Sequence, residues 1–93
     1  MREKIIEHKL AVRAKKMGGI ALKFMSPGWG GMPDRIVLFS LGKMAFVEVK
    51  APGMKPRPLQ KARHEMLRAL GFNVYVLDQE NQIGGILDAI QSS

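Results

Sequence analysis

Apolar positions in three segments of the chain recur every three or four residues, which is the spacing of one face of an α-helix. These segments cover residues 3–17, 59–70 and 81–90. Gly18 follows the first segment and Gly71 the second, and a glycine in this place commonly ends a helix. The stripe that we expect the second helix to bury consists of Leu59, Ala62, Met66, Leu67 and Leu70. The pattern therefore predicts three helices, the last of them short.

Four shorter segments carry the continuous or alternating apolar runs that are typical of β-strands. They cover residues 20–25, 35–39, 43–49 and 72–77. The segments 26–33 and 51–58, which are rich in Gly and Pro, are predicted to be loops. The order is thus α-β-β-β-α-β with a short C-terminal helix. A strand, a crossover helix and another strand imply an α/β fold with a mixed sheet flanked by helices.

Two carboxylates are predicted to meet across the hairpin formed by the second and third strands. If Ser40-Leu41-Gly42 is a three-residue loop with Gly42 in the left-handed conformation, the same register places Asp34 opposite Glu48. Opposed side chains have Cβ atoms about 4.5–5.5 Å apart, so two carboxylates would repel unless a cation offset them. Mg²⁺ suits such a pair, because it binds one or two carboxylates together with waters and phosphate oxygens. A two-residue loop would instead put the carboxylates on opposite faces.

Lys50 and Val49 complete the predicted centre. Lys50 lies two residues after Glu48, so both side chains point to one face of the strand, and the ammonium can orient or deprotonate an attacking water or neutralise phosphate charge. Val49 points to the other face, but its carbonyl is available as a third oxygen ligand. Each residue alone has a structural interpretation: Asp34 can end a loop, and Glu48 and Lys50 can form a solvated strand face. Their joint spacing favours a metal-binding centre that cleaves phosphodiesters.

The amino-acid composition excludes some classes of protein and favours one class of binding partner. The chain has 93 residues, is 46% hydrophobic and lacks cysteine, which argues against disorder and excludes a disulfide scaffold or thiolate metal site. Its net charge of +7 favours a polyanionic partner, nucleic acid before an acidic membrane surface. We find no apolar run near the roughly 20 residues that span a bilayer, and no signal-peptide pattern. We therefore expect one soluble intracellular domain over residues 1–93, with no membrane partner.

The motifs resemble a known nuclease family. Gly31-Met32-Pro33-Asp34 followed by Val47-Glu48-Val49-Lys50 resembles the PD-(D/E)XK nuclease pattern, and more narrowly the chain resembles the virus-type replication-repair nuclease domain, VRR-NUC. The likeness covers nearly the whole chain, from an early helix carrying Glu7 to Gln60 at the start of the following helix. It implies a restriction-endonuclease-like core, and a stand-alone, phage- or prophage-like member acting in the cytoplasm of a bacterial host.

The resemblance also implies roles for individual residues. Asp34 and Glu48 would bind Mg²⁺ or Mn²⁺ with help from the Val49 carbonyl, and Lys50 would be the catalytic lysine. Gln60 would position water, metal or substrate, although it can also simply satisfy backbone groups at the helix start.

Glu7 would approach the metal or its waters, although it can also be an ordinary surface carboxylate. Many members of the family carry a serine shortly before the glutamine, whereas this chain has Arg57-Pro58-Leu59 there, which we interpret as a change in loop capping.

Basic residues near the motifs are candidates for contacts with DNA phosphates. They are Lys23, Arg35, Lys55, Arg57 and Lys61, any of which can also belong to a solvated basic face. Trp29 can stack on a base or wedge a junction, or it can cap the core or an oligomer interface. We expect His8 and His64 to be surface residues without a metal or acid–base role.

Together these features predict a metal-dependent, structure-specific DNA endonuclease without an organic cofactor. By family resemblance it would act as a homodimer on branched DNA, Holliday junctions above all, because two centres related by a two-fold axis can cut a four-way junction symmetrically. The alternatives are a flap or non-specific endonuclease, a non-catalytic DNA-binding module, and a basic structural or toxin-like protein.

Overall fold

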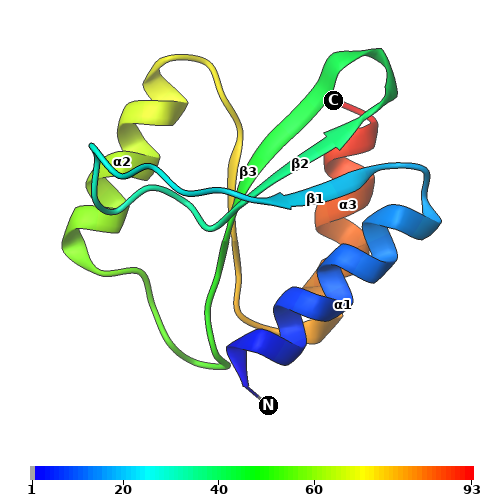
Figure 1. The fold of residues 1–93 in the computed structure, drawn as a ribbon, viewed down its shortest axis with the longest axis horizontal. Helices are drawn as coiled ribbons and strands as arrows, with labels where there is room; N and C mark the ends of the chain where they lie inside the picture. The colour runs from blue at the N-terminus through cyan, green and yellow to red at the C-terminus, as the bar shows by residue number, and fades with distance from the viewer. Residues whose placement is uncertain (1) are drawn as a thin grey trace.

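The computed structural model describes residues 2–93, and its elements follow the predicted order (Figure 1). They are α1 (Glu3–Lys16), β1 (Ile20–Lys23), β2 (Arg35–Phe39), η1 (Ser40–Gly42), β3 (Lys43–Val49), α2 (Pro58–Ala69), β4 (Val74–Leu77), η2 (Glu80–Gln82) and α3 (Ile83–Gln91). The strands form one sheet in the order β1-β2-β3-β4, antiparallel except for the parallel pair β3–β4. The predicted mixed sheet is therefore confirmed.

The hairpin between β2 and β3 has the predicted register. Phe39 pairs with Lys43, and the ladder continues to Arg35 opposite Val47. Gly42 has a φ of 72°, in the left-handed region, as expected for a three-residue loop. Leu41 also has a positive φ, 66°, which the sequence did not suggest for a residue with a branched side chain. Continued by one more pair, this register brings Asp34 and Glu48 opposite one another.

The helices cover opposite faces of the sheet. α1 and α3 lie on one side and α2 on the other (Figure 1). The main core joins α1 and α3 to the sheet through buried apolar residues such as Leu10, Val47 and Leu87. A smaller cluster under α2 is built on Phe46, Leu67 and Val74. Because side chains alternate along β3, Val47 and Val49 face the large core whereas Phe46 and Glu48 face α2.

The buried face of α2 is not the one that its apolar pattern predicted. Leu67 is buried, but Leu59 is 50% exposed and Leu70 is 68% exposed, whereas His64 is buried. The helix is rotated because its contact with the sheet includes polar groups that meet Glu48, so Gln60 and His64 take inward positions. The orientation of α2 predicted from its apolar stripe alone was therefore wrong.

The strands β1 and β4 are shorter than predicted, and the reason at β4 lies in the end of α2. Gly71 has a φ of 97°, its N–H donates to the carbonyl of Arg68, and the N–H of Phe72 donates to the carbonyl of Leu67. This pair of bonds is a Schellman cap, so the first residues of the predicted strand close the helix instead. Among residues 2–93 the structure contains no helix that is both long and apolar enough to cross a bilayer.

Candidate active site

Asp34 is held between two strands at the end of the hairpin. Its backbone carbonyl accepts a hydrogen bond from the N–H of Phe24 at 2.7 Å, which extends the pairing of β1 with β2 by one step. Its carboxylate Oδ2 accepts a hydrogen bond from the N–H of Val49 at 2.9 Å. The side chain therefore reaches across to β3 and lies beside Glu48. The residue before it, Pro33, is fully buried and fixes the approach of the loop.

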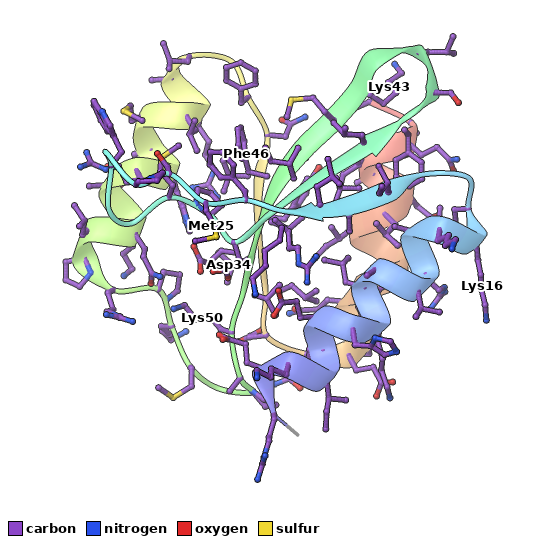
Figure 2. The ribbon with its side chains drawn as sticks, in the orientation of Figure 1. Lys16, Met25, Asp34, Lys43, Phe46 and Lys50 are labelled. Carbon is purple, nitrogen blue, oxygen red and sulfur yellow. The ribbon has the colours of Figure 1, made fainter. Side chains whose placement is uncertain are left out.

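Glu48 is fully buried on the α2 side of β3, and besides Asp34 three donor side chains approach its two oxygens. Lys50 Nζ lies 3.9 Å from Oε2, which confirms that Lys50 and Glu48 share a face of the strand. Gln60 Nε2 lies 3.4 Å from the same oxygen, and His64 Nε2 lies 3.2 Å from Oε1. Figure 2 shows Asp34 and Lys50 together on the α2 side of the strands. The predicted trio of Asp34, Glu48 and Lys50 is thus brought together.

Burial and the neighbouring Asp34 strongly perturb the ionisation of Glu48. Burial, then a hydrogen bond to Asp34 and the negative charge of Asp34, raise the pKa of Glu48 to about 8. The positive charge of Lys50 opposes this rise but does not cancel it. Without a divalent cation, Glu48 therefore keeps its proton at neutral pH and donates it toward Asp34. Such a pair ionises fully once a cation lies beside it.

These donors fit a magnesium-like ion. No group of three or more His, Asp or Glu side chains is arranged to hold a metal anywhere in residues 2–93. Mg²⁺ and Mn²⁺ do not require such a cage, because they accept one or two carboxylates and keep waters for the other positions. The adjoining carboxylates of Asp34 and Glu48 are the donors that this chemistry needs. Val49, the predicted carbonyl ligand, is the residue whose N–H holds Asp34.

Gln60 caps the start of α2 and also contacts Glu48. Its Oε1 accepts a hydrogen bond from the backbone N–H of Arg57 at 2.8 Å, which caps the start of α2. This bond turns the amide nitrogen toward Glu48. Pro58 occupies the first turn of the helix, where its missing N–H costs nothing. The segment Arg57-Pro58-Leu59 is therefore compatible with a Gln60 that still reaches the site.

His64 corrects a prediction. It was expected at the surface, yet the residue is 2% exposed and its ring contacts Glu48. Burial, followed by the positive charges of Arg68 and Lys50, lowers the pKa of His64, so the ring is neutral at neutral pH. The available signal was its spacing, because His64 lies four residues after Gln60 and therefore on the same helix face. His8, in contrast, is exposed as predicted.

Glu7 and Arg35 form an ion pair between α1 and the sheet. Arg35 Nε and Nη2 lie 2.8 and 2.7 Å from Glu7 Oε1, and Nη1 donates to the carbonyl of Ala21 at 3.0 Å. Both side chains are less than one-fifth exposed. The predicted phosphate contact by Arg35 does not fit this placement, because its guanidinium is already engaged. Glu3, one helical turn earlier, lines a cavity with Lys50 and raises the pKa of Glu48, a role that sequence reasoning missed.

Three of the other predicted phosphate contacts line cavities that also include Lys50 or His64. Lys55, Arg57 and Lys61 are exposed, and Lys55 and Arg57 share with Lys50 a cavity of about 280 Å³. Lys55 and Lys61 also line a larger cavity of about 400 Å³, on whose wall His64 lies. Lys23 is exposed and lies further away, at the end of β1.

Trp29 attaches its glycine-rich loop to α2. The guanidinium carbon of Arg63 lies 4.4 Å from the centre of the Trp29 ring, and Arg63 Nε donates to the carbonyl of Gly30 at 2.9 Å. Gly31 has a φ of 82°, and a Cβ there would lie 2.8 Å from Leu59 Cγ. Close approach to α2 therefore requires glycine at this position. The loop that carries Asp34 and the helix that carries Gln60 and His64 are thus fastened together.

Comparisons with known proteins agree with the fold. The family model described as the VRR-NUC domain matches residues 4–80. The chain is 50% identical over 90 residues to "Putative nuclease p44" of Acyrthosiphon pisum secondary endosymbiont phage 1, a match that covers 97% of this chain and 96% of that protein. It is also similar to a solved structure described as a VRR_NUC domain, with a TM-score of 0.85, 31% identity and coverage of 92% of this chain and 94% of that one.

Proposed function

Because the chain belongs to the VRR-NUC family of nuclease domains, we propose that it is a metal-dependent DNA endonuclease centred on Asp34, Glu48 and Lys50. The observation that carries the proposal is the fully buried carboxylate of Glu48, beside Asp34, with the Lys50 ammonium 3.9 Å away. A protein that only binds DNA gains nothing from two adjoining carboxylates near the phosphates. A centre that must hold a divalent cation requires them.

In this mechanism Asp34 and Glu48 would hold Mg²⁺ or Mn²⁺, with the Val49 carbonyl as a further oxygen donor. The chemistry supplied at this position is polarisation of the scissile phosphate and acidification of a water. Lys50 orients that water and offsets the charge that develops on the phosphate. Gln60 keeps Glu48 Oε2 in place, and the N–H of Val49 does the same for Asp34. Lys55, Arg57 and Lys61 draw the DNA backbone toward the centre.

We propose branched DNA, four-way junctions above all, as the substrate, and a homodimer as the active form. The phage origin of the 50% identical relative supports action in a bacterial host, where such DNA intermediates arise. Ile20, Leu22 and Leu38 are each more than one-third exposed on the α2 side of β1 and β2, and offer an apolar surface to a second copy. Two centres related by a two-fold axis would match the two-fold symmetry of a junction.

The proposal is tested by cleavage of linear, flap and four-way DNA of equal length with Mg²⁺ present. We expect cleavage that is fastest on the four-way DNA and absent in EDTA. Equal rates on all three substrates would refute the junction specificity and favour a non-specific endonuclease. Glu48→Ala should abolish cleavage while binding remains, and unchanged cleavage by this variant would refute the assigned centre. Sedimentation of the wild-type protein as a monomer at all concentrations would refute the homodimer.

A further inference from the structure

His64 is a buried titratable residue that the proposed mechanism leaves without a task. It lies on α2 with 2% exposure, and its Nε2 is 3.2 Å from Oε1 of Glu48, which is itself fully buried. Filling space under α2 would not require His64 to contact Glu48, the carboxylate of the centre that lies on β3. The contact joins a helix residue to a candidate metal ligand on a different element.

The two oxygens of Glu48 have different partners. His64 contacts Oε1, while Gln60 and Lys50 approach Oε2 at 3.4 and 3.9 Å. The terminal torsion of a glutamate side chain has a broad, two-fold preference, so rotation of the carboxylate is not fixed by the chain itself. Donors on both oxygens are needed to hold it in one orientation.

α2 is well placed to supply these donors. Gln60 and His64 are four residues apart, so both project from one face of the helix. The helix cannot easily shift, because Arg63 is bonded to Gly30 at its middle and a Schellman cap closes its end. An apolar residue in place of His64 would leave Oε1 buried without a donor, and a buried acceptor that lacks both a donor and water is unfavourable.

We propose that His64 is a positioning residue whose Nε2–H donates to Glu48 Oε1 and thereby fixes the carboxylate orientation in which Oε2 faces the site shared with Asp34 and Lys50. This inference rests on the proposed function, since it concerns the same centre. Partners that orient a metal ligand from behind change metal affinity or activity by about 10–100-fold when they are removed. His64 acts through Glu48, and so is expected to affect the metal and the turnover but not the capture of DNA.

The test compares His64→Leu with His64→Gln, because the Gln side chain can place an N–H close to the position of Nε2. Mn²⁺ affinity is measured by calorimetry on the free protein, kcat and KM on cleavable DNA, and unfolding by thermal melting. We expect His64→Leu to weaken Mn²⁺ binding and lower kcat about tenfold or more, with KM unchanged, and His64→Gln to restore most of both. The control is His8→Leu, which removes an exposed histidine of α1 and should change neither quantity.

Two outcomes would overturn the inference. One is wild-type Mn²⁺ affinity and kcat in a folded His64→Leu protein. The other is an equal loss in both His64 variants at unchanged melting temperature, because the donor would then be irrelevant. If His64→Leu fails to fold, the test uses the folded His64→Gln protein alone. Mn²⁺ affinity within a few-fold of wild type then supports the inference, and a larger loss overturns it. Wild-type protein that neither binds Mn²⁺ nor cleaves DNA would instead refute the proposed function itself.

Discussion

Glu48→Gln should make the metal-free protein more stable at alkaline pH. The pKa of Glu48 is raised from 4.5 to about 8 by burial and by Asp34. The unfolded chain therefore loses this proton before the folded protein does, and the free energy of unfolding falls as pH rises between these two values. Each tenfold step in proton affinity is worth about 1.4 kcal/mol, so the full loss is about 5 kcal/mol above pH 8 and about 3 kcal/mol at pH 7.

Glutamine copies the protonated state of Glu48 without its titration. Its amide oxygen can accept from His64 Nε2 where Oε1 does in the wild type, and its amide nitrogen can donate toward Asp34. That nitrogen cannot accept from Gln60 Nε2 as Oε2 does, so one long bond of 3.4 Å is lost. Because the side chain is fully buried, solvent screening does not reduce the effect. The variant should therefore keep at pH 8.5 the stability that the wild-type protein shows only in acid, apart from groups that titrate in both proteins.

Urea denaturation in EDTA at pH 5.5, 7 and 8.5 measures this difference directly. We expect the Glu48→Gln variant to exceed the wild-type protein by only about 1 kcal/mol at pH 5.5 and by several kcal/mol at pH 8.5. Adding Mg²⁺ should narrow the gap by stabilising only the wild-type protein. Glu65→Gln, which removes an exposed carboxylate of α2, should change stability by less than about 0.5 kcal/mol at every pH. A Glu48→Gln variant that is no more stable than wild type at pH 8.5 would refute this account of the site.

Three further substitutions probe other parts of the structure. Lys50→Met should lower kcat by about 10²–10⁴-fold in a cleavage assay with Mg²⁺, because the centre loses the group that orients water and offsets charge; retained turnover would contradict that role. Glu7→Ala should lower the free energy of unfolding by about 1–3 kcal/mol, measured in urea, because Arg35 is left partly buried without its partner. Leu41→Asn should raise the melting temperature by a few degrees, since Leu41 is 93% exposed and its φ of 66° suits asparagine better, whereas a lower value would argue against backbone strain in the turn.

The hairpin and the centre of the site were predictable because both depend on local, periodic rules. A three-residue loop with Gly42 determines the register, the register places Asp34 beside Glu48, and strand alternation adds Lys50. The structure confirms the loop, the register and the proximity of Lys50. Their roles in metal binding and catalysis stay predictions that the variants above address.

The orientation of α2 was not predictable in the same way. Counting apolar residues assigns the inward face to Leu59 and Leu70, because the hydrophobic effect dominates most helix faces. At this helix a buried carboxylate on the neighbouring strand attracts polar donors, and Gln60 and His64 turn inward to meet it. That competition depends on a contact between elements distant in sequence, which no local pattern contains. The partner of Arg35 was unpredictable for the same reason. Its positive charge indicated a contact with DNA phosphates, but in the structure it pairs with Glu7 of α1.

The free-energy cost of ionising Glu48 and the proposed nuclease function have the same physical cause, the burial of Glu48 beside Asp34. A carboxylate buried beside Asp34 costs free energy when it ionises, and an apolar or amide residue in its place would give a more stable metal-free fold. In the proposed function a divalent cation would offset that cost, because it would interact favourably with both charges at once and not in the same way with the unfolded chain. The ionised Glu48 that a metal site requires therefore lowers the stability of the metal-free protein, whereas a bound metal ion would make the same ionised state favourable. The donors on His64 and Gln60 contact Glu48 in the free protein, so its position does not depend on a bound ion.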